Sequence, residues 1–151
     1  MAGFTTAMPT SFKGELPQAI HNFTLTTGNT FKVALGIVSP AGTYGAATTN
    51  YSNLTGNSDE VPNGSGYTTG GVTLTNITPL TSGTGAYWQF GTNPSWTSAS
   101  FSTTGCIIYN SSASNKAVYT GSFGGTQTVT GGTFTLVQPT NGVGTSLLQL
   151  N

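Results

Sequence analysis

Apolar residues recur at every second position through much of this chain, in short runs separated by turn-forming residues. Phe31, Val33 and Leu35 form one such run, and Trp88 and Phe90 belong to another. A period of two places the apolar side chains on one face of a β-strand, whereas a helix needs a period near 3.6. Gly and Thr are abundant and strong helix formers are sparse. The sequence therefore predicts an all-β fold, an antiparallel β-sandwich of jelly-roll-like type with eight or more short strands.

The pattern also predicts where individual strands and turns lie. The first strands are expected to form a hairpin around residues 27–29, and the continuous apolar run of residues 105–110 is typical of a central strand. Residues 111–115 and Trp96 are expected on turns, and the glycine doublets at 124–125 and 131–132 are expected to interrupt strands. The core is expected to contain Phe31, Val33, Leu35, Trp88, Phe90, Ile107, Phe134 and Leu136.

The two ends of the chain differ from its middle. Phe12, Leu16 and Ile20 lie four residues apart, which predicts a short helical turn near residues 11–20. The expected organisation is an arm with a short helix over 1–22, a sandwich domain over 23–139 and a tail over 140–151. The extended N-terminal arm is either a disordered terminus or a strap over a neighbouring subunit. Both ends are expected to contribute more to assembly than to folding.

Charged residues are rare, at 4% of the chain, against roughly 25% in an ordinary soluble domain. Three lysines and three acidic residues give a net charge of zero, which favours association. Three lysines cannot form the basic stripe that nucleic-acid binding needs. No apolar run approaches the roughly 20 residues of a membrane helix, and the beginning of the chain lacks the pattern of a signal peptide. We therefore expect a protein that is made and folds in a cytoplasm, with neither nucleic acid nor membrane as partner.

Titratable side chains are too few for most catalytic or metal sites. His21, Cys106 and three acidic residues are the whole supply, so we expect no enzymatic activity, no metal and no cofactor. Cys106 lies in an apolar run and is expected to be a buried, unreactive thiol. His21 is expected to form a local hydrogen bond at the end of the N-terminal turn. Asp59 and Glu60 are either oxygen ligands for calcium or part of a solvated loop.

Residues 39–71 contain Gly, Ser, Asn and tyrosines, with little apolar periodicity. A connection of about 30 residues is too long to be a plain linker, so it is either a functional surface loop or contains short edge strands. Aromatic residues on such loops add binding area at low entropic cost. The candidate interface combines aromatic and apolar side chains of this loop, the arm, the tail and one turn: Phe4, Met8, Phe12, Tyr44, Tyr51, Tyr67, Trp96, Leu147, Leu148 and Leu150.

Several local motifs occur in one order along the chain: Phe12-Lys13 with Leu16, then residues 20–24, 30–35, 66–71, 106–110 and 131–135. From about residue 11 to 138, the set resembles a family of small virion proteins of tailed bacteriophages. The resemblance implies a virion structural protein, interpreted here as a capsid decoration or cement protein on the capsid surface. Its implied partners are the major capsid protein and further copies of itself, as a homotrimer or another homo-oligomer. Residues 39–62 and the tail after Pro139 contain no matching motif.

Two other functions stay open at the level of sequence. A tail, collar or fibre component would use the same Gly-, Thr- and Ser-rich β-structure. A carbohydrate-binding module would stack Trp88, Trp96 and the tyrosines on sugar rings, although Trp88 alternates with core positions.

Overall fold

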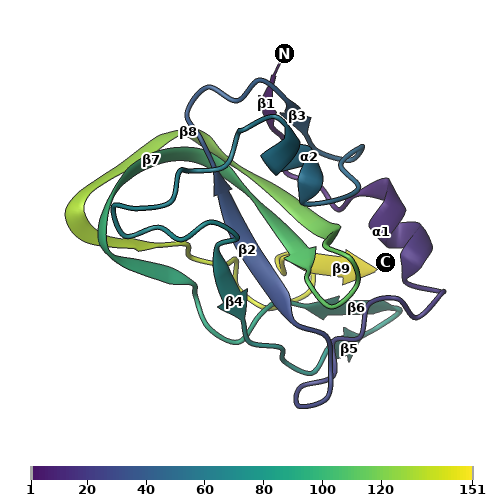
Figure 1. The fold of residues 1–151 in the computed structure, drawn as a ribbon. Helices are drawn as coiled ribbons and strands as arrows, with labels where there is room; N and C mark the ends of the chain where they lie inside the picture. The colour runs from purple at the N-terminus through teal and green to yellow at the C-terminus, as the bar shows by residue number, and fades with distance from the viewer. Residues whose placement is uncertain (1, 151) are drawn as a thin grey trace.

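The computed structural model describes residues 2–150 and consists mainly of antiparallel β-structure (Figure 1). The main sheet has four strands in the order β4-β2-β7-β8, which are Val72–Leu74, Phe31–Gly36, Ser95–Asn110 and Lys116–Thr135. A second sheet, in the order β5-β6-β9, contains Leu80–Ser82, Gly85–Trp88 and Leu148–Leu150. The remaining elements are the parallel pair β1 (Gly3–Phe4) and β3 (Thr43–Tyr44), helix α1 (Thr10–Glu15) and helix α2 (Ser52–Gly56). The predicted all-β class is confirmed.

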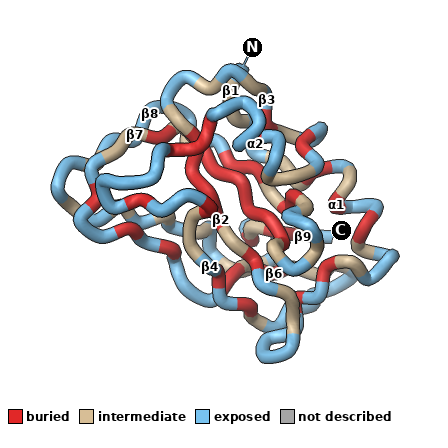
Figure 2. The backbone as a smooth tube through the Cα atoms, viewed as in Figure 1, coloured by how far each residue is buried: buried red, intermediate tan, exposed pale blue. Residues whose placement is uncertain are grey.

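The centre of the main sheet is buried on both faces (Figure 2). On one face, Phe31, Val33 and Leu35 of β2 belong to a core that also contains side chains of β6 and β9. On the other face, Ala34 and Ile107 pack in a second core with residues of β3 and α2. Burial on both faces explains why residues 105–110 form a continuous apolar run without alternation.

The predicted core is largely confirmed. Buried side chains are Phe31, Val33, Leu35, Trp88, Phe90 and Ile107. Phe134 and Leu136 are only partly buried and pack at the margin of the larger core, because the end of β8 lies away from the centre of the sheet.

One long hairpin replaces several of the short strands that the sequence predicts. β7 and β8 pair along nearly their whole length around the predicted turn at 111–115, and both curve together on the left of Figure 1. The predicted turn at Trp96 and the predicted strand breaks at the two glycine doublets are wrong. Gly124 and Gly131 adopt φ values of 73° and 61°, and the pairing shifts register at several points. Such irregularities bend a strand without ending its pairing.

The predicted hairpin around residues 27–29 is also wrong. β2 begins only at Phe31, and its antiparallel neighbours are β4 and β7. The preceding residues form a loop closed by two asparagines: Asn29 N donates to Asn22 O at 2.7 Å, and Asn22 N donates to Asn29 Oδ1 at 2.8 Å. Asparagine side chains that satisfy backbone groups locally compete with a strand ladder.

Both ends of the chain pack on their own fold. β1 pairs with β3, and Ala7 exchanges two backbone hydrogen bonds of 2.9 Å with Thr120 of β8. At the other end, β9 pairs with β6 and buries Leu148. Residues 2–22 and 140–150 thus pack with the segment between them. This packing does not fit the interpretation of the arm as a disordered terminus. That both ends contribute more to assembly than to folding stays a prediction.

Phe4 lies against the sheet where two glycines face each other. Gly36 of β2 pairs with Gly105 of β7, and a Cβ on either residue would lie 2.1 Å or 2.3 Å, respectively, from the Phe4 ring. The same ring stacks on Tyr44, with 4.8 Å between centroids. The two glycines thus make a seat in which an aromatic ring contacts the backbone of the sheet.

The seat predicts strong coupling between Gly36 and Phe4. Gly36→Ala should displace the arm and destabilise the protein by about 1–3 kcal/mol, as overpacking does. In a Phe4→Ala background the same change should be nearly neutral, because the nearest atoms to the new methyl group all belong to Phe4. Urea unfolding of the four proteins measures this coupling. Additive effects would show that Phe4 does not occupy the seat.

The second core makes a simpler prediction. Ile107 is fully buried between the two layers, whereas Val137 is 70% exposed. Ile107→Ala should lower the free energy of unfolding by about 2–5 kcal/mol. Val137→Ala is the matched control and should change it by less than about 0.5 kcal/mol. Denaturant unfolding followed by tryptophan fluorescence measures both, and equal effects would contradict the assigned inward face of β7.

Candidate functional surfaces

All three acidic side chains take part in structural hydrogen bonds, with Glu15, Asp59 and Glu60 exposed by only 8%, 2% and 9%. Asp59 accepts hydrogen bonds from Ala41 N at 2.9 Å, Gly42 N at 2.8 Å and the Tyr44 hydroxyl at 2.5 Å. Burial alone would raise the pKa of Asp59, but these hydrogen bonds outweigh it and lower the pKa. Asp59 therefore stays ionised and holds the residues before β3.

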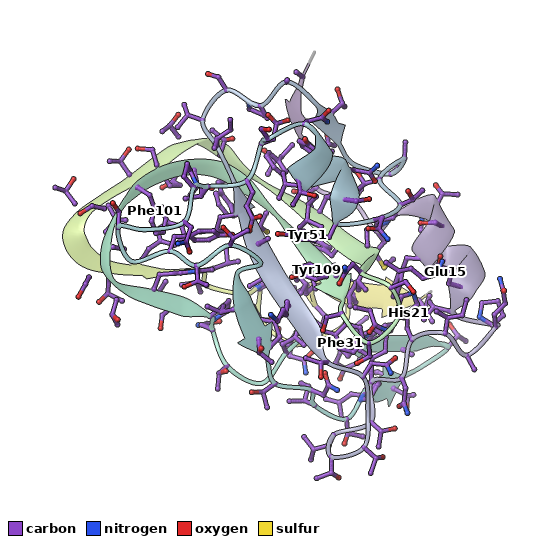
Figure 3. The ribbon with its side chains drawn as sticks, in the orientation of Figure 1. Glu15, His21, Phe31, Tyr51, Phe101 and Tyr109 are labelled. Atoms are coloured by element: carbon purple, nitrogen blue, oxygen red, sulfur yellow. The ribbon has the colours of Figure 1, made fainter. Side chains whose placement is uncertain are left out.

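Glu60 holds two tyrosines of residues 39–71, one that precedes it in the sequence and one that follows it. Its carboxylate accepts hydrogen bonds from the Tyr51 hydroxyl, the Tyr67 hydroxyl at 2.7 Å and Gly70 N at 2.7 Å. Tyr109 stacks on Tyr51 with 4.4 Å between centroids and donates to Gly70 O (Figure 3). Burial, followed by the interaction with Glu60, raises the pKa of each of these three tyrosines, that of Tyr109 to about 12. The hydroxyls of these three tyrosines therefore stay protonated and remain available as hydrogen-bond donors.

These contacts correct the interpretation of Asp59 and Glu60 as a solvated loop. They do not favour the calcium interpretation either, because the two carboxylates belong to separate networks and already accept protein donors. Within residues 2–150, no three His, Cys, Asp or Glu side chains gather in a way that suits a metal ion. The pair instead fixes residues 39–71 against the main sheet, with Tyr44 and Leu54 in the second core and Val61 and Tyr67 in the larger core. This segment contains β3 and α2, so part of it is the hidden strand that the sequence left open.

His21 forms the local hydrogen bond that the sequence predicts. Its Nε2 lies 2.7 Å from Glu15 Oε2, and Asn110 Nδ2 lies 3.1 Å from its Nδ1 (Figure 3). Lys116 Nζ donates to the other oxygen of Glu15 at 2.6 Å. Burial lowers the pKa of His21 although the adjacent Glu15 acts in the opposite direction. A neutral His21 that donates to Glu15 and accepts from Asn110 ties α1 to the turn between β7 and β8.

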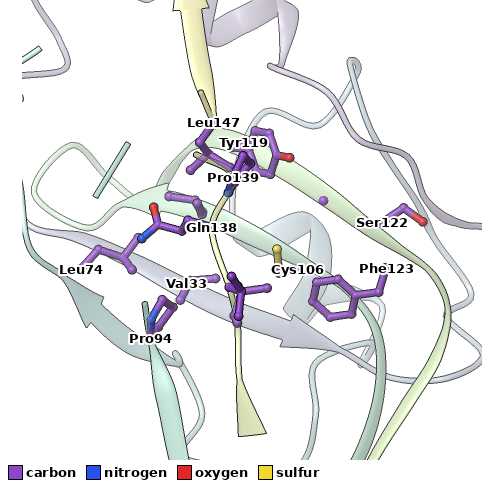
Figure 4. Close-up of a pocket in the computed structure, with 14 residues that line it drawn as sticks. Val33, Leu74, Pro94, Cys106, Tyr119, Ser122, Phe123, Gln138, Pro139 and Leu147 are labelled. Carbon is purple, nitrogen blue, oxygen red and sulfur yellow. The ribbon is translucent and has the colours of Figure 1, made fainter. Parts of the chain in front are cut away.

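An apolar cavity of about 160 Å³ lies between the main sheet and residues 136–139 (Figure 4). Its walls include Val33, Ile108, Leu136 and Leu147, with Cys106 on one side. Cys106 is buried as predicted, and burial raises its pKa to about 12. A thiol in this state is a poor nucleophile. The cavity is large enough for a small apolar group, but no acid, base or cation lines it.

The predicted interface residues divide into two sets. One set is buried in its own chain and cannot meet a partner on this surface, which corrects the prediction for Phe12, Tyr44, Tyr67, Trp96 and Leu148. The rings of Tyr44 and Tyr67 face inward because their hydroxyls donate to the buried carboxylates of Asp59 and Glu60. Trp96 faces inward because it packs with Tyr67, Phe101 and Phe134. The other set is at least partly exposed and comprises Phe4, Met8, Tyr51, Leu147 and Leu150. Trp88 and Trp96 are both buried, so neither offers a ring face to a sugar.

Sequence reasoning missed the outer edge of β8. This strand ends the main sheet, and the arm covers its first part through Ala7 on Thr120 and through Thr6 Oγ1, which accepts from Ser122 N at 3.1 Å. From residue 123 to 135, no strand within residues 2–150 pairs with the outer edge. Most of these residues are exposed (Figure 2). The sequence signal was present, because no charged residue occurs from Ala117 to Asn151.

Comparison with protein family models, with curated proteins and with solved structures gives no significant match. No helix within residues 2–150 has the length and apolar character needed to cross a membrane. The function must therefore be argued from the chemistry of the chain.

The Asp59 network predicts a loss of stability in acid. Because the pKa of Asp59 is lower in the folded state, its contribution is fully present above the unfolded pKa near 4 and is lost as the pH falls through the folded pKa. Asp59→Asn should therefore reduce stability at pH 7 and flatten its decline below about pH 4. Urea unfolding across this range, compared with the wild type, measures the change. Parallel curves for the two proteins would contradict the assigned role.

Proposed function

We propose that this chain is a non-catalytic structural protein of a bacteriophage virion, a decoration or cement protein that binds the outer surface of the major capsid protein lattice and stabilises it. The observation that carries the proposal is the internal use of every acidic side chain. Glu15, Asp59 and Glu60 are buried in contacts that hold the fold together, and His21 and Cys106 are buried as well. Among residues 2–150, none of these five side chains is exposed for general acid, general base or nucleophilic catalysis.

The same observation favours assembly. With its acids buried, the protein presents a surface of hydroxyls, amides, backbone and scattered apolar groups, and among residues 2–150 the exposed or partly exposed charged side chains are lysines. Such a surface has little self-repulsion and associates readily. The two sheets pack through a shared core, and the sandwich of jelly-roll-like type expected from the sequence is part of this proposal. The phage context rests on the sequence resemblance.

A tail, collar or fibre component is the second candidate, and the long curved β7–β8 hairpin is the observation that favours it. Extended two-stranded ribbons of this length suit contacts between stacked or ring-forming subunits. The carbohydrate-binding alternative has less support, because its two tryptophans are buried.

Copy number tests the proposal. Quantitative mass spectrometry of purified virions should give this protein in a fixed, high ratio to the major capsid protein, as a lattice decoration requires. A few copies per virion would contradict capsid decoration and favour the tail assignment.

Binding to separated particles gives a second readout. Purified protein should bind capsids that lack it to saturation and raise the temperature at which they rupture, while purified tails should bind none.

A further inference from the structure

We propose that two copies of this chain associate through the outer edge of β8, residues 123–135, as an antiparallel strand pair about a two-fold axis. The main sheet would then continue from one copy into the other. This inference stands on the geometry of the sheet and does not depend on the capsid assignment.

The edge has the properties that allow strand pairing. Outward-facing backbone N–H and C=O groups of an edge strand are ready partners for another strand. Proteins protect such edges with charged side chains, proline, short strands or a covering segment. β8 contains neither a charge after Lys116 nor a proline, and the arm covers it only as far as Ser122. The backbone groups on the outer edge of residues 123–135 therefore have none of these protections.

Bulges can also protect an edge, and β8 has register irregularities. Between them, however, Gln127, Thr128 and Val129 keep regular pairing with residues 101–103 of β7. The outer side of this segment therefore presents an ordinary strand edge. We place the two-fold axis close to Thr128.

A second copy is the occupant that the chemistry favours. When identical edges meet about a two-fold axis, each side chain near the axis lies opposite a copy of itself, so any charge would face a like charge. No charged residue occurs from Ala117 to Asn151, so this repulsion does not arise. Thr126, Thr128 and Thr130 are exposed there, and facing threonines are a favourable cross-strand pair. A different protein partner would have no charge pattern on this edge by which to recognise it.

Single cysteines test the pairing directly, because Cys106 is the only cysteine and is buried. Directly opposed residues of an antiparallel pair have Cα atoms about 4.5–5.5 Å apart, which matches a disulfide. Under mild oxidation, Thr128→Cys should form a disulfide-linked dimer fastest, Thr126→Cys and Thr130→Cys more slowly, and the loop control Thr27→Cys at only the rate of random collision. Equal rates at all four positions would overturn the proposal.

Charge on the edge gives an independent test. Wild-type protein should show a reversible monomer–dimer equilibrium in sedimentation equilibrium, Thr126→Lys/Thr130→Lys should remain monomeric, and Thr26→Lys/Thr27→Lys should dimerise as the wild type does. Circular dichroism and thermal melting establish that the variants are folded. A monomeric or trimeric wild type, or an edge variant that still dimerises, would overturn the proposal. Either result leaves the capsid copy-number measurement unaffected, so the two proposals can fail separately.

Discussion

The burial of β2 and β7 on both faces is the constraint on which the rest of the structure depends. A sheet centre of this kind needs two covering layers, and the two differ in composition. One side is covered by apolar and aromatic side chains that include Phe12, Phe23, Trp88 and Leu148. The other is covered by Phe4 and by Tyr44, Tyr51 and Leu54 of residues 39–71. This segment is rich in glycine and polar residues, and it also contributes Val61 and Tyr67 to the first side. Such a segment has too few apolar groups to hold itself down by burial alone.

Buried carboxylates solve this problem. Charge-assisted hydrogen bonds from tyrosine hydroxyls and backbone amides are stronger than neutral ones. They stabilise the ionised carboxylate, whose burial without such partners would cost free energy. Asp59 and Glu60 each collect several such donors, so a mostly polar segment becomes an ordered layer. Using the acids inside the fold also leaves the surface nearly uncharged. The two acidic residues of this segment thus act as structural anchors and add no charge to the surface.

The features that could be predicted from the sequence are those set by local periodicity. β2, the second half of β7 and the turn after it follow from alternation or from a continuous apolar run, and the burial of Cys106 follows from its neighbours. The inward orientation of Tyr44 and Tyr67 could not be predicted, because an aromatic residue on a Gly-rich loop suits either a surface or a core until the position of its hydroxyl acceptor is known. Gly124 and Gly131 lie at bends within β8 and do not end the strand. Residue type alone does not distinguish a glycine at a bend from a glycine at the end of a strand. The open edge of β8 depends on how far the arm reaches, which only the fold reveals.

The seat of Phe4 imposes an order on folding. Its floor is made by Gly36 and Gly105, and the arm is fixed further along by Thr120. Contacts between such distant parts of a chain close late, after the loop entropy between them has been overcome. The segment that contains Phe4 and Ala7 therefore has no place to dock until β7 and the start of β8 have been synthesised and paired. Docking of Phe4 therefore follows completion of this part of the sheet.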